Sequence, residues 1–315
     1  MLLDDKSILI TGGTGSFGKA FTKYVLDNYN PKKIIIYSRD EFTQFIMQNE
    51  FKQYAGKLRF FIGDVRDKER LTRAFEGVDY VIHAAALKQV PACEYNPAEA
   101  IKTNIHGAQN VIDAALDTGV KKVVALSTDK AVNPTNIMGA SKRLCEMIIQ
   151  TFSRYSKTEF VAVRFGNVLG SNGSVIPLFK KQMAAGGPVT VTHPDIIRFF
   201  MTIPEAVSLV MQAGALAHGG EIFVLDMGEP VKIADLAKNL IRLSGYTLGV
   251  DMNIEYTGLR PGEKLYEEIL TKEEGLQKTA NNLIYVGQPL EFDEVHFLSE
   301  LKKLEIAASE EPRDV

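Results

Sequence analysis

The sequence predicts an α/β protein: a doubly wound parallel Rossmann sheet with a smaller C-terminal substrate-binding lobe. Short runs of apolar and β-branched residues alternate with stretches of helical spacing. These runs are apolar throughout, as expected of parallel strands covered on both faces by helices. A glycine-rich loop follows the first run and opens the first helical stretch. Together, these observations favour a doubly wound sheet over a sandwich or a helical bundle.

The expected elements follow in chain order. Strands are predicted at residues 7–11, 33–37, 58–62, 80–83, 122–126 and 160–163, and helices at 16–26, 98–116 and 139–155. After about Asn167 the pattern loosens, because Gly186-Gly187-Pro188, His193-Pro194 and residues 258–262 interrupt short elements. We therefore expect a Rossmann domain over residues 1–166 and a substrate lobe over residues 167–315, interleaved with the end of the sheet.

Composition limits the classes of function. The 315 residues suit one large α/β domain with a smaller lobe. A net charge of −3 gives no reason to expect a nucleic-acid partner. Cys93 and Cys145 are too few for a disulfide framework or a thiolate metal site, so we expect no metal and a reducing, cytoplasmic setting. The start of the chain is charged and no apolar run is long enough to span a membrane, so neither a signal peptide nor a membrane segment is expected.

The glycine-rich loop predicts a dinucleotide site. Its sequence is Gly12-Gly13-Thr14-Gly15-Ser16-Phe17-Gly18, between a predicted strand and a predicted helix. Glycine lets the backbone approach a pyrophosphate, and free amides at the helix N-terminus bind its charge. The same pattern alone could form a tight turn, but its position between strand and helix favours the cofactor.

Three further segments are predicted to hold the cofactor. At the end of the second strand, Ser38-Arg39-Asp40 offers an arginine for the 2′-phosphate of NADP and an acid for the 2′-hydroxyl of NAD. Arg39 favours NADP, and Asp40 leaves NAD open. Asp64-Val65 ends the third strand and is expected to meet the adenine. Ala84-Ala85-Ala86 follows the fourth strand as a floor of small residues.

The chemistry is predicted from Ser127-Thr128-Asp129-Lys130, followed by Met138 and Lys142. This layout resembles the Ser/Thr and Tyr-x-x-x-Lys site of short-chain dehydrogenases, in which the lysine also binds the nicotinamide ribose. Here Met138 replaces the tyrosine and cannot act as acid or base. An adjacent acid and base suit elimination instead, because a hexose oxidised at C4 has an acidic C5 proton. Asp129 would protonate the departing C6 hydroxyl, and Lys130 would remove the C5 proton.

These residues and several others resemble UDP-N-acetylglucosamine 4,6-dehydratases, which are extended short-chain dehydrogenases/reductases of capsule and glycan biosynthesis. The similar segments, within residues 5 to 290, are 14–18, 37–40, 63–67, 84–91, 127–134, 164–167 and 260–264. The resemblance implies UDP-GlcNAc as substrate and a UDP-4-keto-6-deoxy-HexNAc as product. It also implies Asp129 as acid, Lys130 as C5 base, a tightly bound and recycled cofactor, and a homo-oligomer.

Met138 places the chain with the methionine branch of this family, so the missing tyrosine does not imply inactivity. The group that deprotonates the C4 hydroxyl stays open among Thr128, Asp129 and a water held by Lys142. Inversion or retention at C5 stays open too. Some relatives of this branch are tethered by N-terminal membrane helices, so this chain is expected to be a naturally short enzyme or an excised catalytic part.

The resemblance also implies residues that bind the nucleotide sugar. Asn167, Ser174 and Val175 lie in the segment that lines the sugar and diphosphate in such enzymes. Lys180, Arg198 and Arg260 supply positive charge for two phosphates. Glu263 is expected to accept from the uridine ribose. Lys88 is expected at a phosphate of the substrate or the cofactor.

Two other functions fit parts of the pattern. A UDP-sugar 4-epimerase needs the same oxidation at C4 but no acid for C6. A non-catalytic NADP-binding sensor would explain Met138 but leaves Asp129 and Lys130 without a purpose.

Overall fold

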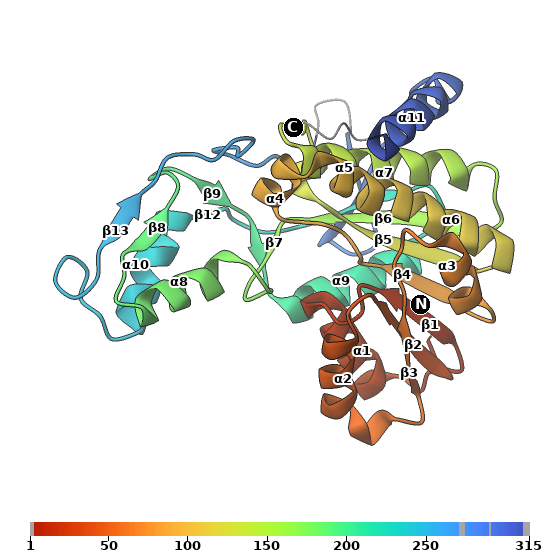
Figure 1. Ribbon diagram of the computed structural model, residues 1–315, viewed down its shortest axis with the longest axis horizontal. Coiled ribbons are helices and arrows are strands. Elements are labelled where there is room, and N and C mark those ends of the chain that lie inside the picture. Colours follow the sequence, from red (N-terminus) through yellow and green to blue (C-terminus); the bar gives the residue numbers. More distant parts are fainter. Residues whose placement is uncertain (1–2, 271–274, 290, 311–315) are drawn as a thin grey trace.

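The computed structural model describes residues 3–270, 275–289 and 291–310. Its centre is a nine-stranded sheet in the order β14-β15-β11-β6-β5-β4-β1-β2-β3 (Figure 1). The parallel strands are β1 (Ser7–Thr11), β2 (Lys33–Ser38), β3 (Leu58–Ile62), β4 (Tyr80–His83), β5 (Lys122–Thr128), β6 (Glu159–Phe165) and β11 (Ile222–Leu225). At one edge, β15 (Ile284–Gly287) runs antiparallel to β11, and β14 (Leu276–Lys278) runs antiparallel to β15.

The doubly wound parallel sheet predicted from the sequence is confirmed. All six predicted strands are present, and β5 and β6 extend further toward their carboxyl ends than expected. This extension brings Ser127 and Thr128 into β5, at the edge where such sheets bind ligands.

The helix predicted at residues 98–116 is not continuous. It consists of α5 (Pro97–Ala100), the π-helical segment η2 (Ile101–His106) and α6 (Gly107–Thr118). The Gly107 amide bonds to the Lys102 carbonyl five residues before it. A π-turn changes which side chains face inward, and here Asn104, in this segment, is buried and bonded to Leu87 and Ser141.

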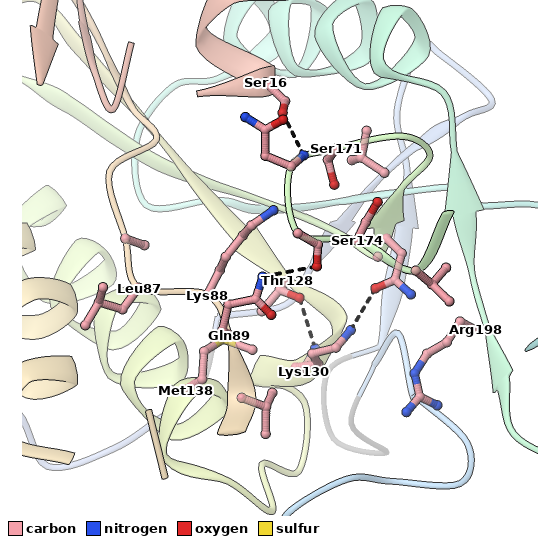
Figure 2. A pocket seen from close by; sticks show the side chains of 18 of the residues that line it. Ser16, Leu87, Lys88, Gln89, Thr128, Lys130, Met138, Ser171, Ser174 and Arg198 are labelled. Atoms are coloured by element: carbon pink, nitrogen blue, oxygen red, sulfur yellow. Dashed lines mark hydrogen bonds between the residues drawn. The ribbon is translucent and has the colours of Figure 1, made fainter. Parts of the chain in front are cut away.

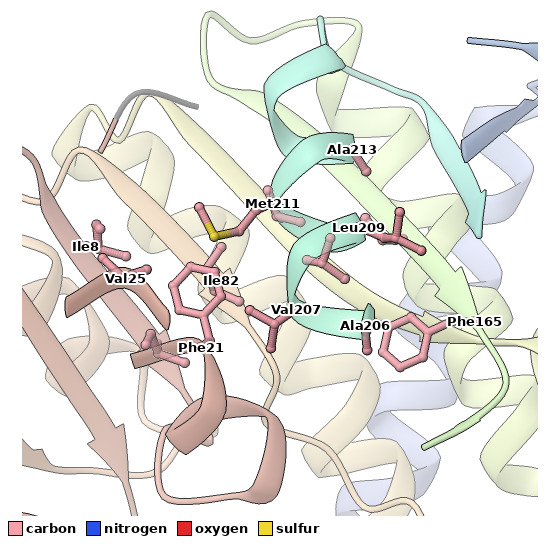
Figure 3. Close-up of a cluster of buried hydrophobic side chains, with 14 of the residues drawn as sticks. Ile8, Phe21, Val25, Ile82, Phe165, Ala206, Val207, Leu209, Met211 and Ala213 are labelled. Carbon is pink, nitrogen blue, oxygen red and sulfur yellow. The ribbon is translucent and has the colours of Figure 1, made fainter. Parts of the chain in front are cut away.

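Helices cover both faces of the sheet. On one face lie α1 (Ser16–Asn28), α2 (Glu41–Glu50) and α9 (Ile203–Leu216), and Figure 3 shows Phe21 and Val25 of α1 meeting Val207 and Met211 of α9. The other face holds α3 (Lys68–Phe75), α6, α7 (Ile137–Ser153) and α11 (Glu294–Ser309). Successive strand residues alternate between the two cores, as a pleated sheet requires.

The remaining elements form a smaller lobe, at the left of Figure 1. They are β7 (Asn167–Val168), α8 (Val175–Ala184), β8 (Val189–Val191), β9 (Ile197–Arg198), β10 (Phe200–Met201), β12 (Val231–Lys232), α10 (Ile233–Leu243) and β13 (Ile254–Tyr256). The lobe has its own apolar core, with Phe179, Val191 and Ile241 at its centre. The chain leaves the sheet after β6 but returns for α9 and β11 and again for β14, β15 and α11, so residues after 166 contribute to both parts.

Three short helices connect the sheet elements: η1 (Lys52–Tyr54), α4 (Val90–Tyr95) and η3 (Asp129–Ala131). None of the helices within residues 3–270, 275–289 and 291–310 combines the length and apolarity that a membrane span requires.

Gly18 allows α1 to lie directly against the glycine loop. A Cβ at this position would lie 2.5 Å from the Gly13 carbonyl oxygen, and the backbone there cannot yield cheaply. We expect Gly18→Ala to lower the free energy of unfolding by about 1–3 kcal/mol, the usual cost of overpacking. Urea unfolding measures the change.

Gly56→Ala is the matched control, because a Cβ at Gly56 meets nothing within 4 Å and its φ is not positive. This variant should be as stable as the parent or slightly more stable. Equal stability of the two variants would show that α1 can move away from the loop at little cost.

Candidate active site

A cavity of about 680 Å³ lies between the carboxyl edge of the sheet and the smaller lobe. The sheet side contributes the glycine loop, residues 84–91 and the ends of β5 and β6, and the lobe contributes residues 171–175, β8, β9 and the loop around Arg260. Among the predicted site residues, those lining the cavity are Gly12, Thr14, Gly15, Ser16, Phe17, Gly18, Ala84, Ala85, Ala86, Lys88, Thr128, Lys130, Met138, Lys142, Asn167, Ser174, Val175, Arg198, Arg260 and Glu263.

The glycine loop has the geometry of a pyrophosphate cradle. Gly12 has a φ of +64°, and a Cβ there would lie 2.9 Å from Ala85, so only glycine fits. The helix α1 starts after Gly15, whose lack of a side chain leaves the first helical amides uncapped. Ser16 accepts a hydrogen bond from the Asn172 amide at 3.0 Å, which ties α1 to the lobe (Figure 2).

The residues predicted to bind the adenosine half of the cofactor do not line this cavity. Asp40 is the N-cap of α2, since its Oδ1 accepts from the amides of Phe42 and Thr43 at 2.8 and 3.2 Å. The Arg39 side chain is 54% exposed, and its Nη1 lies 3.5 Å from Asp64 Oδ2. Burial opposes ionisation of Asp64, but its hydrogen bonds with Arg66 lower its pKa below the usual value.

Ser38 and Val65, also predicted to bind the cofactor, have structural roles instead. The Ser38 carbonyl and hydroxyl oxygens both accept from the Gln44 side chain at 3.0 Å. Val65 is buried in the core beneath α6. Neither side chain lines the cavity.

The segment after β4 is held in place by Asn104, which sequence reasoning missed. Its side chain accepts from the Leu87 amide at 2.7 Å and donates to the Leu87 carbonyl at 2.9 Å. Lys88 and Gln89 therefore face the cavity (Figure 2). Burial lowers the pKa of Lys88, and Gln89 donates to the Gly173 carbonyl at 3.2 Å from across the cavity.

The predicted acid and base are brought together at the end of β5. Lys130 Nζ donates to Asp129 Oδ1 at 2.9 Å and to Asn167 Oδ1 at 3.2 Å. Thr128 Oγ1 donates to the same Asp129 oxygen at 2.8 Å. Asp129 is only 1% exposed and does not line the cavity, whereas Thr128 and Lys130 do. A substrate would therefore reach Asp129 through its two neighbours.

Met138 and Lys142 occupy successive turns of α7. Met138 is 4% exposed and packs into an apolar cluster with Cys93 and Ala100. Lys142 lines the cavity and has no hydrogen bond or ion pair within the described part of the chain. Burial, together with the nearby charge of Lys142, lowers the pKa of His83 to about 3. The His83 imidazole is therefore neutral at pH 7.

The end of β5 is held on its buried side by Glu146 of α7, another residue that was not predicted from the sequence. Glu146 accepts from Ser127 Oγ at 2.6 Å, from Arg164 at 2.7 and 3.1 Å, and from Arg143 at 2.9 Å. Arg164 is fully buried and also donates to the Ile269 carbonyl at 3.1 Å. This ionic cluster joins α7, β5, β6 and the segment after the lobe.

Most of the charged residues predicted to bind the nucleotide line the cavity, but Lys180 does not. Arg198 is buried and donates to the Ile197 and Lys264 carbonyls and, at 3.5 Å, to Glu263. Glu263 also accepts from the Arg260 amide at 3.1 Å, so it orders this loop as well as facing the cavity. Arg260 is exposed at the cavity, whereas Lys180 points outward from α8 and does not line it.

Asn167 accepts a hydrogen bond from Lys130. Ser174 is the N-cap of α8, and Val175 is its first residue. The Ser174 hydroxyl is buried without a hydrogen-bond partner in the described residues. No group of three or more His, Cys, Asp or Glu side chains in the same residues is placed to hold a metal ion.

The parallel sheet with helices on both faces, together with the glycine loop between β1 and α1, defines a doubly wound Rossmann fold. The chain belongs to the polysaccharide biosynthesis protein family, whose model matches residues 8–289.

Individual relatives agree with this assignment. The capsular polysaccharide biosynthesis protein CapD of Staphylococcus aureus is 54% identical over 292 residues, which cover 91% of this chain and 48% of CapD. The UDP-N-acetylglucosamine 4,6-dehydratase (inverting) of Campylobacter jejuni is 48% identical over 277 residues, covering 87% of this chain and 80% of that enzyme. The resemblance predicted from the sequence is thereby confirmed, although the chain spans only about half the length of CapD.

A solved structure shows the same fold. Pen from Bacillus thuringiensis superposes with a TM-score of 0.86 at 42% identity, covering 92% of this chain and 90% of Pen.

We expect Glu146→Gln to lower the free energy of unfolding by about 3–5 kcal/mol, because it removes the negative charge from a buried ion cluster. Chemical denaturation measures the change. The control is Glu300→Gln on α11, where Glu300 pairs with Lys303 at 2.7 Å on the surface. That variant should show no measurable change, and a similar loss in both would refute the structural role of Glu146.

Proposed function

We propose that this chain is a UDP-N-acetylglucosamine 4,6-dehydratase that forms a UDP-4-keto-6-deoxy-HexNAc for glycan or capsule biosynthesis. The proposal rests on the hydrogen-bonded group of Thr128, Asp129 and Lys130, where a carboxylate oxygen and an amine nitrogen lie 2.9 Å apart beside the cavity. Plain hydride transfer needs no such acid–base pair. The name of the Campylobacter relative supports the substrate.

The proton path follows from the hydrogen bonds. Met138 is packed among apolar side chains and offers no acid–base group. Thr128 lines the cavity and donates to Asp129, so its hydroxyl can accept the C4 proton while passing its own proton to Asp129. Asp129 then returns this proton, through Thr128, to the C6 hydroxyl, which leaves as water. Lys130 removes the C5 proton.

The residues present fit a nicotinamide dinucleotide. The pyrophosphate would lie at Gly12 and the uncapped start of α1, and Lys142 would hold the nicotinamide ribose. When bound, the nicotinamide would take a hydride from C4 and return it to C6, so the cofactor is recycled. We propose NADP over NAD, because Asp40 is used as a helix cap while Arg39 is exposed beside Asp64.

Cofactor preference gives a direct test of Arg39. We expect Arg39→Ala to bind NADP roughly 10–100-fold more weakly, the loss of one or two hydrogen bonds to a charged group, and to bind NAD as before. Isothermal titration with each nucleotide measures both. Arg59→Ala, an exposed arginine on the neighbouring strand β3, is the control and should change neither. Equal affinities of the parent for the two nucleotides would contradict the assignment.

The reaction itself is tested by an NMR time course with UDP-GlcNAc in D₂O. We expect a new C6 methyl signal with deuterium at C5. Inversion at C5, proposed from the name of the Campylobacter relative, would appear in the coupling pattern of the sugar. A new UDP-sugar epimeric at C4 without a methyl signal would indicate an epimerase, and nucleotide binding without turnover would indicate a sensor.

Asp129→Asn separates dehydration from simple binding. We expect at least a 10²-fold loss of the methyl product, the usual contribution of a positioned acid, with UDP-GlcNAc still bound. Asp235→Asn, an exposed aspartate on α10, is the control and should react at the parent rate. Unchanged dehydration by Asp129→Asn would remove Asp129 from the mechanism.

A further inference from the structure

Glu267 is a buried carboxyl group beside the proposed base, and neither the sequence motifs nor the proton path above uses it. Its side chain is 4% exposed and lines the same cavity as Lys130. Its Oε1 lies 3.8 Å from Lys130 Nζ and 3.6 Å from Arg198 Nε. Its Oε2 is buried without a hydrogen-bond partner in the described chain.

The surroundings of Lys130 are suited to an ammonium ion. Oxygens of Asp129, Asn167 and Glu267 surround its Nζ at 2.9, 3.2 and 3.8 Å. An ammonium has three N–H groups to donate and no lone pair for the C5 proton. Lys130 must therefore lose a proton before it can act, and the proton needs an acceptor nearby.

Asp129 already has another role in the proposed proton path. Its Oδ1 accepts hydrogen bonds from both Thr128 and Lys130. The proposed proton path also needs Asp129 as a carboxylate, ready for the C4 proton. Glu267 accepts no hydrogen bond within 3.5 Å from the residues that the structure describes, so it is free to receive a proton.

Burial is the main effect that favours the protonated form of Glu267. Burial raises the pKa of Glu267, and the charge of Asp129 raises it further, against the opposing effects of Lys130, Arg198 and Lys264. The carboxyl groups of Asp129 and Glu267 both approach Lys130 Nζ, at 2.9 and 3.8 Å, so a proton can pass from this nitrogen to Glu267 over a short distance.

We propose that Glu267 accepts the proton of Lys130, so that Lys130 enters the reaction as a free amine while Asp129 stays a carboxylate. A Lys130 N–H bond breaks and a Glu267 O–H bond forms, giving a neutral pair in place of a buried ion pair. Asp129 then receives the C4 hydroxyl proton through Thr128. The free amine takes the C5 proton, the electrons of the C5–H bond form the C5–C6 double bond, and the C6 hydroxyl leaves as water with the proton that Asp129 received. Glu267 acts through Lys130 and is a positioning residue.

The first test does not depend on the substrate. The infrared spectrum of the ligand-free chain at neutral pH should contain the carbonyl band of a protonated carboxyl group. Glu267→Gln should remove this band. Glu268→Gln should keep it, because Glu268 is half-exposed and bonded to Asn133. Absence of the band from the parent, or its persistence in Glu267→Gln, overturns the proposal whether or not the proposed function is correct.

The second test rests on the proposed function and measures deuterium incorporation at C5 against pH. In the parent and in Glu268→Gln, the proton stays within the Lys130–Glu267 pair, so the rate should be constant across neutral pH. In Glu267→Gln the proton must leave to solvent, so the rate should fall at least about tenfold at neutral pH and recover about tenfold per pH unit as pH rises.

A role of Glu267 in folding alone would give a different result, since it would lower the rate equally at every pH. That outcome, or a parent-like profile for Glu267→Gln, contradicts the proposal. Glu267→Asp keeps a carboxyl group and should keep the flat profile, which provides the test if the glutamine variant folds poorly. Failure of the parent to exchange C5 at all would count against the proposed function, and the infrared result would still decide the state of Glu267.

Discussion

A buried ion pair between Glu146 and Arg164 fixes the geometry on which the candidate active site depends. Both side chains are almost completely removed from solvent, and together they join α7, β5, β6 and the segment at Ile269. Ser127 donates to the same glutamate, so the strand end that carries Thr128, Asp129 and Lys130 is anchored from the protein interior. Because an unpaired buried charge is so unfavourable, a disturbance of this pair affects the site and the fold together.

The sequence predicted those features that depend on local pattern. Apolar strands and helical spacing predicted the parallel sheet, and Gly12 to Gly18 predicted the turn between β1 and α1, which lines the cavity. The sequence could not predict the π-turn at η2, Asn104, Glu146 or Glu267, because each acquires its role only through contacts distant in the chain, such as Asn104 with Leu87 or Glu146 with Arg164. Taken singly, a glutamate in a helix or a loop is expected on the surface.

Charged residues were the least predictable, because charge alone does not say where a side chain points. Lys180 and Arg198 were both expected at phosphates. Lys180 is exposed on α8 outside the cavity, whereas Arg198 lines the cavity and also holds the loop that contains Glu263. Asp40 offered an acid for NAD in the sequence, but its position one residue before α2 makes it a helix cap. Self-association rests on the resemblance alone and stays a prediction.

Under the proposed function, Met138 leaves proton transfer to the charged groups buried at the end of β5. A tyrosine on α7 would supply an ionisable hydroxyl for proton transfer, whereas Met138 adds an apolar contact to the cluster around Cys93. In the proposed mechanism Asp129 and Lys130 carry out proton transfer, and both side chains are largely buried. At this site, Asp129 Oδ2 and Glu267 Oε2 are buried without hydrogen-bond partners among the described residues. Such groups lower stability, and folded proteins keep them mainly where function requires them.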